Sequence, residues 1–480
     1  MAALPQQYDP LTYPAVQKIL QLADQRACKL YIVGGYVRDA LLSRSNATGA
    51  PKDFDFMVMP GGAVDFARAV SDMLVGHFVL LDATNDTARV VTDTGEYFDF
   101  AGCVGGSLET DIKRRDFSIN ALVWDSAQPD EVVDLVGGVS DIARKQVRAI
   151  SEQSFIDDPL RVLRAYRFAA LLHFDIDEST NSYMRKHAAL LKQVAAERIS
   201  SELFLMLETN AAGKQVKAMG EAGILEEIFS ELKETRRVTK NAFHHLALFD
   251  HSVETLVQSE LAMMQMPDWA QESFAQSLSA GVTRRAATKL AGLIHDIGKP
   301  DTWIVTDEGK HTFIGHDKLG AEMCEPLARR LKWAKPVERF VEKLVRWHLR
   351  PGHLFQQGEP TDKAKYRFYK TIGDELPELI VLALADFRST CGPGLQDGRR
   401  EAEGKLQELL HNFTVYNVGK AKESRYLNGS EIMDILGIKP GQVVGELLDD
   451  LLEAQTLGEI KNHDEAALLA RKLYQEKYCR

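Results

Sequence analysis

The 480-residue sequence contains no run of about 18 apolar residues, which argues against a membrane-spanning helix. Its first residues show no basic segment followed by an apolar stretch, so we expect no signal peptide. The chain has only five cysteines, an odd number without paired spacing, which argues against a disulfide framework and a zinc knuckle. These absences predict a cytoplasmic protein with reduced thiols.

The chain also has fewer basic than acidic residues. The sequence has 58 Lys and Arg residues against 69 Asp and Glu residues, a net charge of −11. This balance argues against a protein coated with nucleic acid, although it allows a local basic groove. A hydrophobic content of 45% and a charged content of 26% are typical of a globular protein.

The order of expected elements divides the chain into four regions. Residues 1–149 alternate short apolar, strand-like runs with helical periodicity and predict an α+β head. Residues 150–225, 226–412 and 413–480 have helical patterns, and we call them the neck, the third region and the tail. Within the third region, residues 265–283 are polar and predict a surface loop.

Two carboxylates stand two residues apart in the apolar run "KDFDFMV". In a strand, Asp53 and Asp55 would point to the same face, where their repulsion requires a positive charge between them. Mg²⁺ takes oxygen ligands and commonly links carboxylates to substrate phosphates. Asp99, in "YFDFAG", adds a third acid, which suits two-metal phosphoryl transfer. The alternative is a solvent-facing strand, but the flanking apolar residues indicate one buried face.

A glycine pair precedes a helical run in "YIVGGYVRDALL". Gly34 and Gly35 let the backbone approach a bound group, and the start of the helix offers free N–H donors. Arg38 lies close by, and "DIKRRDFSINAL" adds Arg114 and Arg115, whose charge could neutralise polyphosphate. The pattern predicts a triphosphate cradle, although a plain strand-to-helix turn also explains the glycines.

These motifs, followed by "DLVGGVSDIARKQVR" and "DDPLRVLRAYRFAA", resemble the class II tRNA nucleotidyltransferase family, which includes CCA-adding enzymes and bacterial poly(A) polymerases. The resemblance implies a polymerase-β-like nucleotidyltransferase head, with catalytic Mg²⁺ on Asp53 and Asp55 and a third acid at Asp99. It implies CTP and ATP as substrates and the 3′ end of tRNA as the acceptor. It further implies nucleotide or metal contacts at Gly34, Gly35, Arg38, Arg114, Arg115, Asp116 and Asn120.

The neck carries a candidate base-selecting pair. Asp158 and Arg161, at positions i and i+3, would share one helix face and present an acceptor beside a donor. Cytosine and adenine both offer an amino group beside a ring-nitrogen acceptor, which this pair could match. An ordinary helix ion pair is the alternative. The family usually has Glu where Asp157 stands. Arg164 and Arg167 extend a basic side that could bind nucleotide or RNA, or simply face solvent.

One short segment bears on the product. In CCA-adding relatives a longer flexible segment follows the strand of the third acid, whereas here only residues 101–110 occupy that place. In the family a shortened segment accompanies enzymes that add C residues and stop before the terminal A. CC addition is therefore a candidate beside CCA addition, although a loop can also be shortened without loss of function.

Histidine and aspartate recur through the third region in "FDHSVET", "LIHDIGKP", "IGHDKLG", "VRWHLRP" and "LALADFRS". Their nitrogen and oxygen atoms suit Mn²⁺, Fe²⁺, Ni²⁺ or Zn²⁺. The series resembles the helical HD superfamily of metal-dependent phosphohydrolases, in which a bound ion activates water against a phosphoester. The resemblance implies a phosphate contact at Lys299. It implies metal ligands at His251, His295, Asp296 and Asp386, with His316 and His348 as extra ligands.

The tail resembles the C-terminal segment of the nucleotidyltransferase family and is expected to bind tRNA, with Gly437, Pro440, Gly441 and Gly445 forming a turn between helices. Three alternatives to tRNA nucleotidyl transfer stay open. The chain could be a bacterial poly(A) polymerase, a phosphohydrolase with a nucleotide-sensing front half, or a non-enzymatic RNA-binding protein. The intact acids argue against the second alternative, and the acidic charge argues against the third.

Overall fold

The computed structural model describes residues 3–43, 53–239, 246–390, 396–422 and 425–479. The chain forms two compact units, Met1–Ser230 and Glu231–Arg480. The first unit contains an α+β head followed by helices, and the second is mostly helical, as predicted. The finer division into four regions stays a prediction. No helix in the described part of the chain has the length and apolar character needed to cross a bilayer.

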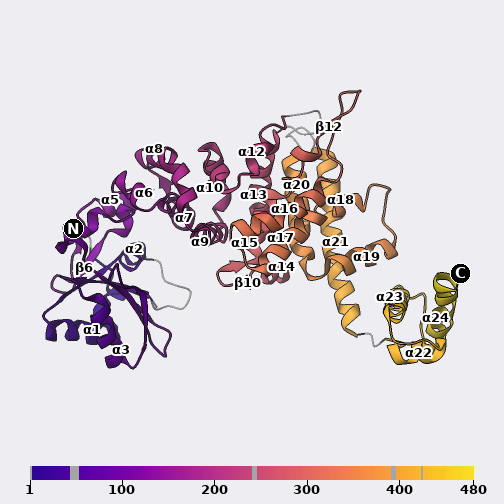
Figure 1. The fold of residues 1–480 in the computed structure, drawn as a ribbon, viewed down its shortest axis with the longest axis horizontal. Helices are drawn as coiled ribbons and strands as arrows, with labels where there is room; N and C mark the ends of the chain where they lie inside the picture. The colour runs from indigo at the N-terminus through magenta and orange to yellow at the C-terminus, as the bar shows by residue number, and fades with distance from the viewer. Residues whose placement is uncertain (1–2, 44–52, 240–245, 391–395, 423–424, 480) are drawn as a thin grey trace. The chain divides into compact units, whose positions relative to one another are not determined.

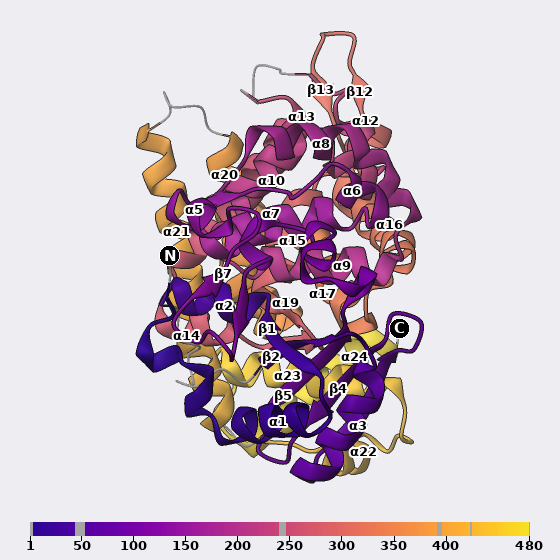
Figure 2. The same cartoon turned by 90° about the vertical axis from the view of Figure 1, so that its left-hand side faces the viewer.

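The head is built on a seven-stranded sheet in the order β3-β4-β5-β2-β1-β6-β7 (Figures 1 and 2). Neighbouring strands run antiparallel except β2 and β5, which are parallel. The strands are β1 (Lys29–Val33), β2 (Asp53–Met59), β3 (His77–Asp82), β4 (Thr87–Val91), β5 (Tyr97–Gly102), β6 (Val123–Asp125) and β7 (Val132–Val133). The two acid-bearing strands, β2 and β5, therefore lie side by side at the centre of the sheet.

Alternation along β2 explains how this strand tolerates two acids. Phe54 and Phe56 enter the main core of the head, which α1 (Pro14–Gln25) and α3 (Ala63–Leu74) cover. Asp53 and Asp55 point to the opposite face and are exposed. The prediction of one buried face is confirmed, and the acids occupy the other face.

The neck helices are α6 (Gln153–Asp157), α7 (Arg161–Leu172), α8 (Glu178–His187), α9 (Ala196–Leu207) and α10 (Ala212–Glu221). Asp158 lies between α6 and α7 with φ −144° and ψ 96°, an extended conformation. The prediction that Asp158 and Arg161 share one helix face is therefore wrong. The cause is Pro159, whose ring disfavours a helical conformation at the residue before it.

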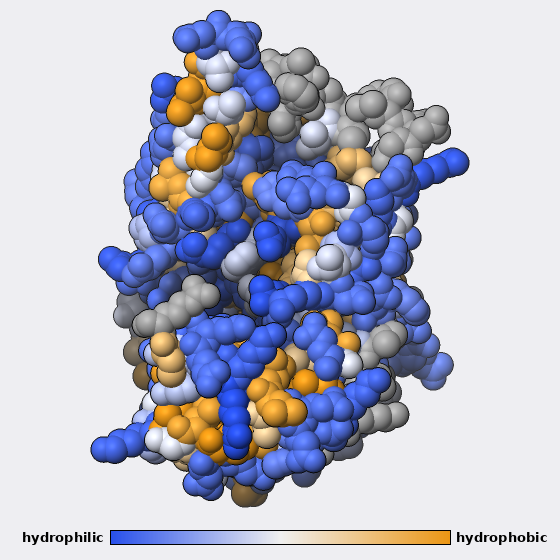
Figure 3. Space-filling view, turned by 90° about the vertical axis from the view of Figure 1, so that its right-hand side faces the viewer, coloured by the Kyte–Doolittle hydropathy of each residue, from blue (hydrophilic) through white to orange (hydrophobic). Residues whose placement is uncertain are grey.

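The second unit packs α13 (Leu248–Met264), α15 (Arg284–Ile294), α17 (Lys335–Trp347) and α20 (Leu376–Thr390) against one another. Flanking these helices are α16 (His316–Arg330), α18 (Arg350–His353), α19 (Asp362–Ile372) and α21 (Gln396–Lys422). A hairpin of β12 (Ile304–Val305) and β13 (His311–Thr312) carries exposed apolar side chains, visible as orange surface in the upper part of Figure 3.

The tail contains α22 (Gly429–Leu436), α23 (Gln442–Thr456) and α24 (His463–Tyr478), which share a small apolar core. Gly437 ends α22 with a left-handed φ of 66°, and Pro440 and Gly441 lie in the turn before α23. Gly445, however, lies inside α23, so its predicted place in the turn is wrong.

Residues 265–283 do not form the predicted surface loop. They form α14 (Asp268–Phe274) and a hairpin of β10 (Ser277–Ser279) and β11 (Val282–Thr283). Ala270 and Phe274, one helical turn apart, are fully buried and pack this segment against the rest of the unit. The polar residues around them make the segment resemble a surface loop in the sequence. Ser273 donates a hydrogen bond of 2.7 Å to the buried carboxylate of Glu378 on α20.

Glu378 makes the stability of the second unit depend on pH. Burial raises its pKa from 4.5 to about 7, although Ser273 and Arg284 partly oppose this shift. Between pH 4.5 and about 7, the Glu378 carboxyl is ionised in the unfolded chain but protonated in the folded chain. The free energy of unfolding therefore falls as pH rises through this range. We predict that Glu378→Gln stabilises the second unit by up to about 3 kcal/mol at pH 8 and much less at pH 4.5.

The melting temperature of the full chain, measured across this pH range, tests the prediction. The matched control is Glu322→Gln, because Glu322 is exposed. A Glu378→Gln variant whose melting temperature follows the parent at every pH would contradict the prediction.

Candidate functional site

The strand carboxylates face a glycine turn in the head. Asp55 pairs in register with Val33, and Gly34 follows with a φ of 78°. A Cβ at Gly34 would lie 3.1 Å from Asp55 Oδ2, so this position requires glycine for its backbone and for close approach. The pKa of Asp55 is raised to about 6. The larger cause is partial removal of its carboxylate from water, and the second is the negative charge of Asp99. The neighbouring Asp53 adds to this effect, so the site attracts a cation.

Asp99 lies beside Asp55 across the parallel β2–β5 pair, as the three-acid prediction requires. Both of its carboxylate oxygens, however, accept hydrogen bonds from the Arg89 guanidinium, at 2.7 and 2.8 Å. Asp53 and Asp55 are therefore the acids available to a metal ion, and Asp99 is held by a cation from β4. Sequence reasoning missed Arg89, which sits ten residues from its partner.

Arg38 lies on α2 (Gly35–Leu41), which begins directly after Gly34, as predicted. Its guanidinium is buried and makes two hydrogen bonds to Asp39 and one of 2.6 Å to the side-chain oxygen of Asn120. Asn120 in turn donates to Asp116 at 3.3 Å. These predicted nucleotide contacts therefore begin a polar chain inside the protein.

The polar chain continues into the neck. Arg164 makes two hydrogen bonds to Asp116 Oδ2, at 3.0 and 2.7 Å, and Arg167 pairs with Glu202 on α9. Burial alone would raise the pKa of Asp116, but the Arg164 charge outweighs it and lowers that pKa. Arg164 and Arg167 are thus internal partners and not a solvated face. Glu202 is a further member that sequence reasoning missed.

The arginine pair after α4 (Leu108–Lys113) surrounds a buried acid. Arg115 Nε donates to Asp111 Oδ2 at 3.0 Å, and Arg114 Nε lies 3.6 Å from Asp111 Oδ1. Asp111 precedes Arg115 by four residues, a spacing that could have revealed this pair. The main-chain carbonyls of Arg114 and Arg115 accept hydrogen bonds from Arg161 Nη1, at 3.0 and 3.4 Å. Main-chain groups of the head thereby hold the side chain of Arg161, the candidate base-selecting residue on the neck helix α7.

Asp158, the other base-selecting candidate, accepts a hydrogen bond of 2.9 Å from Arg198 Nη2 on α9. Asp157 is exposed at the end of α6 and accepts from Gln153. The structure therefore places Asp158 and Arg161 in the same short segment but gives each its own partner: Arg198 for Asp158, and main-chain carbonyls for Arg161. These contacts take the place of the helix ion pair that was the alternative interpretation.

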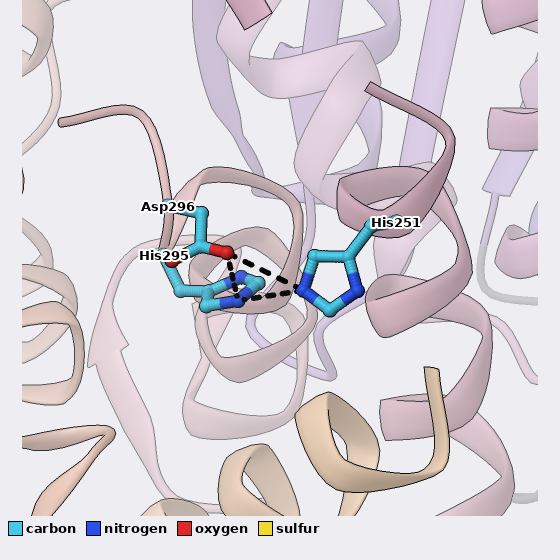
Figure 4. A group of neighbouring side chains, drawn as sticks. All are labelled: His251, His295 and Asp296. Carbon is cyan, nitrogen blue, oxygen red and sulfur yellow. Dashed lines mark hydrogen bonds and ion pairs between the residues drawn. The ribbon is translucent and has the colours of Figure 1, made fainter. Parts of the chain in front are cut away.

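The second unit brings together all six predicted metal ligands. His251 lies on α13, His295 and Asp296 follow α15, and Asp386 lies on α20. His251 Nε2 is 3.3 Å from Asp296 Oδ2 and 3.2 Å from Asp386 Oδ1. Figure 4 shows His251, His295 and Asp296 pointing toward one another. His316, at the start of α16, reaches the same aspartate from another side, with Nε2 3.2 Å from Asp296 Oδ1.

Main-chain carbonyls orient three of the imidazoles. The Nδ1 atoms of His295, His316 and His348 donate to the carbonyls of the residues three positions earlier, at 2.9, 2.6 and 2.7 Å. A ring that donates through Nδ1 directs its Nε2 toward the cluster, which is the arrangement found in metal-binding histidines. Both oxygens of the buried Asp296 lack a hydrogen bond of normal geometry. The donor set therefore fits a divalent ion.

The charges of the cluster agree with this fit. Burial opposes protonation of His295, but Asp296 and Asp386 outweigh it and raise the pKa of His295 to about 10. Burial and the neighbouring His295 lower the pKa of His348 to about 4, which keeps that ring neutral. Lys299 Nζ lies 2.6 Å from Asp296 Oδ2. The carboxylates thus draw positive charge to the centre of the cluster.

A cavity of about 940 Å³ opens beside the cluster. His316, His348 and Asp386 form part of its wall, together with Lys299. Apolar side chains form much of the remainder, and α21 contributes one side: the lining includes Phe313, Leu349, Phe355, Phe387, Lys405 and Leu406. A volume of this size accommodates a small organic ligand.

Three family profiles match consecutive parts of the chain. The poly A polymerase head domain matches residues 82–148, the probable RNA and SrmB-binding site of polymerase A matches residues 173–235, and the HD domain matches residues 248–389. The last match contains all six histidine and aspartate ligands. The recognised resemblances to both families are thereby confirmed.

Curated relatives cover almost the whole chain. The A-adding tRNA nucleotidyltransferase of Deinococcus radiodurans is 32% identical over 93% of this chain and 95% of its own length. The CC-adding tRNA nucleotidyltransferase of Geobacter sulfurreducens is 32% identical over 96% of each chain. Among solved structures, the Thermotoga maritima CCA-adding enzyme has the same fold, with a TM-score of 0.65 and 20% identity over 98% of this chain and 99% of that one. The chain belongs to the tRNA nucleotidyltransferase family.

Proposed function

We propose that this chain adds C residues to the 3′ end of tRNA and stops before the terminal A. The 3′ hydroxyl attacks the α-phosphate of CTP, a new phosphoester bond forms, and pyrophosphate leaves. Its relatives include A-adding and CC-adding enzymes at equal identity, so overall similarity does not distinguish the two products. The observation that carries the proposal is the short connection between β5 and α4, residues 103–107.

This connection is compact and internally bonded. The Ser107 side chain accepts from the main chain of Thr110, and the main-chain N–H of Val104 donates to the buried Asp111 at 3.2 Å. The segment predicted from the sequence, residues 101–110, includes the end of β5 and the start of α4. The connection between these two elements is therefore shorter than the predicted segment. The connection therefore holds α4 in a fixed position against the sheet.

A fixed α4 also fixes the base-selecting segment. The carbonyls that accept from Arg161 belong to Arg114 and Arg115, which directly follow α4. Arg198 holds Asp158 on the other side. A template anchored in this way keeps one donor–acceptor spacing, which suits a single base size. This supports repeated selection of cytosine without a later change to the larger adenine.

Mg²⁺ is the proposed metal of the head, because Asp53 and Asp55 offer two adjacent carboxylates that reach solvent. Bound there, the ion would neutralise the charge of the triphosphate. Asp99 and Arg89 form a fixed pair beside the site that limits the repulsion between Asp99 and Asp55. Gly34 leaves room for close approach to Asp55.

We further propose a second activity, hydrolysis of phosphoesters in the HD domain with Mn²⁺, Ni²⁺, Fe²⁺ or Zn²⁺. The specific observation is the buried donor set of six ligands beside a cavity that also contains Lys299. A divalent ion bound there would activate water, and Lys299 would hold the charge of the phosphate.

The product test uses tRNA that lacks its 3′ CCA end. We predict that the purified chain extends this tRNA by two C residues with CTP alone and gives the same product when ATP is added. Electrophoresis at single-nucleotide resolution measures the length. Addition of A after CC would overturn the proposed stop, and long A tracts would indicate a poly(A) polymerase.

A substitution separates the two activities. Asp55→Asn keeps the side-chain shape but removes a charge from the metal site, so C addition should fall at least 100-fold while hydrolysis of bis(p-nitrophenyl) phosphate is unchanged. Asp65→Asn, at an exposed acid on α3, is the matched control and should retain both activities. Retention of C addition by Asp55→Asn would show that the acids do not bind the catalytic metal.

Metal exchange tests the HD domain. We predict that chelation abolishes hydrolysis and that Mn²⁺ or Ni²⁺ restores it, because the ligand set combines imidazole nitrogen with carboxylate oxygen. The variant His295→Gln should not recover hydrolysis with either ion, yet should keep C addition with Mg²⁺. Hydrolysis that is equally fast in this variant would assign the activity to another site.

A further inference from the structure

We infer that Arg89 on β4 binds the last phosphodiester of the acceptor RNA, and that Asp99 orients Arg89 for this contact instead of binding a catalytic metal. Asp99 is then a positioning residue, and the head gains an RNA site beside its acids. The inference rests on the proposed metal-binding role of Asp53 and Asp55, and it is independent of which nucleotide is added.

The two sides of the acid-bearing strand β2 differ. β1 lies on one side, and the glycine turn at Gly34 that follows it belongs to the proposed triphosphate cradle. β5 and β4 lie on the other side, where Asp55, Asp99 and Arg89 are in register on one face of the sheet. In an in-line displacement, the attacking and leaving oxygens occupy opposite sides of the phosphorus. A triphosphate at Gly34 therefore leaves the β5–β4 side for the RNA end.

The Arg89 guanidinium has donors left for a ligand. Nε and Nη2 donate to the two oxygens of Asp99, at 2.7 and 2.8 Å. Nη1 has no hydrogen-bond partner in the part of the chain that the structure describes. Because the guanidinium is planar and held along one edge, its remaining N–H groups have a fixed direction. The Arg89 side chain is 40% exposed, so these donors reach solvent and can meet a phosphate.

The same two hydrogen bonds argue against Asp99 as a metal ligand. An ion bound to Asp99 would lie beside the Arg89 charge, and the two positive charges would repel each other. Displacing Arg89 to make room for the ion would remove both hydrogen bonds and leave the guanidinium without its partner. The pair is therefore suited to orient a cation for a ligand, while Asp53 and Asp55 take the metal.

An aromatic ring lies beside Arg89 on the same face of the sheet. Tyr97 is in register with Asp53, and Cζ of Arg89 is 5.5 Å from the centre of the Tyr97 ring. Tyr97 and Val79, which is in register with Arg89 on β3, are 38% and 42% exposed. Single-stranded RNA is commonly held by a base stacked on an exposed aromatic ring and a phosphate on a nearby cation. We therefore assign the base of the 3′-terminal nucleotide to Tyr97 and its phosphate to Arg89.

A charge-balanced double variant tests the RNA contact. Arg89→Gln combined with Asp99→Asn removes one positive and one negative charge, so the net charge around Asp55 is unchanged. We predict that this variant binds tRNA lacking its CCA end about tenfold more weakly, in EDTA and without CTP. Loss of one phosphate contact should also reduce the slope of log K against log salt concentration by about 0.7. Fluorescence anisotropy at several salt concentrations measures both quantities.

Kinetics separate an RNA contact from a metal ligand. In the double variant, KM for tRNA should rise about tenfold, while kcat, KM for CTP and the Mg²⁺ requirement stay within about twofold of the parent. Arg68→Gln is the matched control and should change none of these quantities. Arg68 is an exposed arginine on α3 over the ring of Phe78, which packs against the core on the opposite face of the sheet.

Two outcomes would overturn the inference. Parental RNA affinity and salt slope in the double variant would show that Arg89 does not bind the phosphate. A fall in kcat of about 100-fold with unchanged RNA binding would show that Asp99 binds the metal. Because anisotropy in EDTA needs no catalytic metal, it tests Arg89 even if Asp55→Asn retains C addition. Addition of a terminal A would remove the proposed stop after CC and leave the RNA contact standing.

A measurement on the parent chain covers the case in which the double variant fails to fold. A tRNA with 4-thiouridine as its last base should crosslink on irradiation to the β5 peptide that contains Tyr97, and peptide mass spectrometry identifies the site. Crosslinks found only outside β3, β4 and β5 would contradict the assigned position of the terminal base.

Discussion

The ion pair between the buried Asp116 and Arg164 connects the segment after α4 of the head to α7, the first long helix of the neck. Its two hydrogen bonds join a chain that runs from Arg38 through Asn120 to Asp116 and Arg164. Arg38 and Asp116 are buried and Arg164 is half-buried, so the buried charges depend on their partners to remain inside the protein. The same chain fixes α2, whose preceding glycine turn faces Asp55, relative to α7, which begins at Arg161, a candidate base-selecting residue. The proposed metal site and the candidate base-selecting residues are therefore positioned together by this one polar connection.

The sequence predicted the elements of the site better than the partners of its side chains. Alternation of apolar and acidic residues was enough to place Asp53 and Asp55 on one strand face, because that pattern is local. The partners Arg89, Arg198 and Glu202 come from other strands or helices, and no local spacing connects them to Asp99, Asp158 or Arg167. Arginines that the motifs marked as nucleotide contacts therefore turned out to have internal partners.

Sequence periodicity also gave a wrong prediction where a single residue interrupts a helix. Pro159 separates two helices and leaves Asp158 extended, although the surrounding residues favour a continuous helix. In contrast, all six predicted HD ligands come together in one cluster, because the order of the motifs that carry them is specific. Their division between the two oxygens of Asp296 depends on how four helices pack, which a linear pattern does not contain.

The two units handle negative charge in opposite ways, and this difference matches their proposed chemistry. In the head, Asp53 and Asp55 are exposed, so the proposed magnesium ion would arrive with a nucleotide and leave with pyrophosphate. In the second unit, Asp296 and its histidines are buried, and their imidazoles are fixed by main-chain carbonyls. Such a buried, preoriented set of nitrogen donors would hold a resident ion, because releasing it would leave the carboxylate without a counter-charge. Under the proposed function, the head would exchange its metal with each substrate and the HD domain would keep its own.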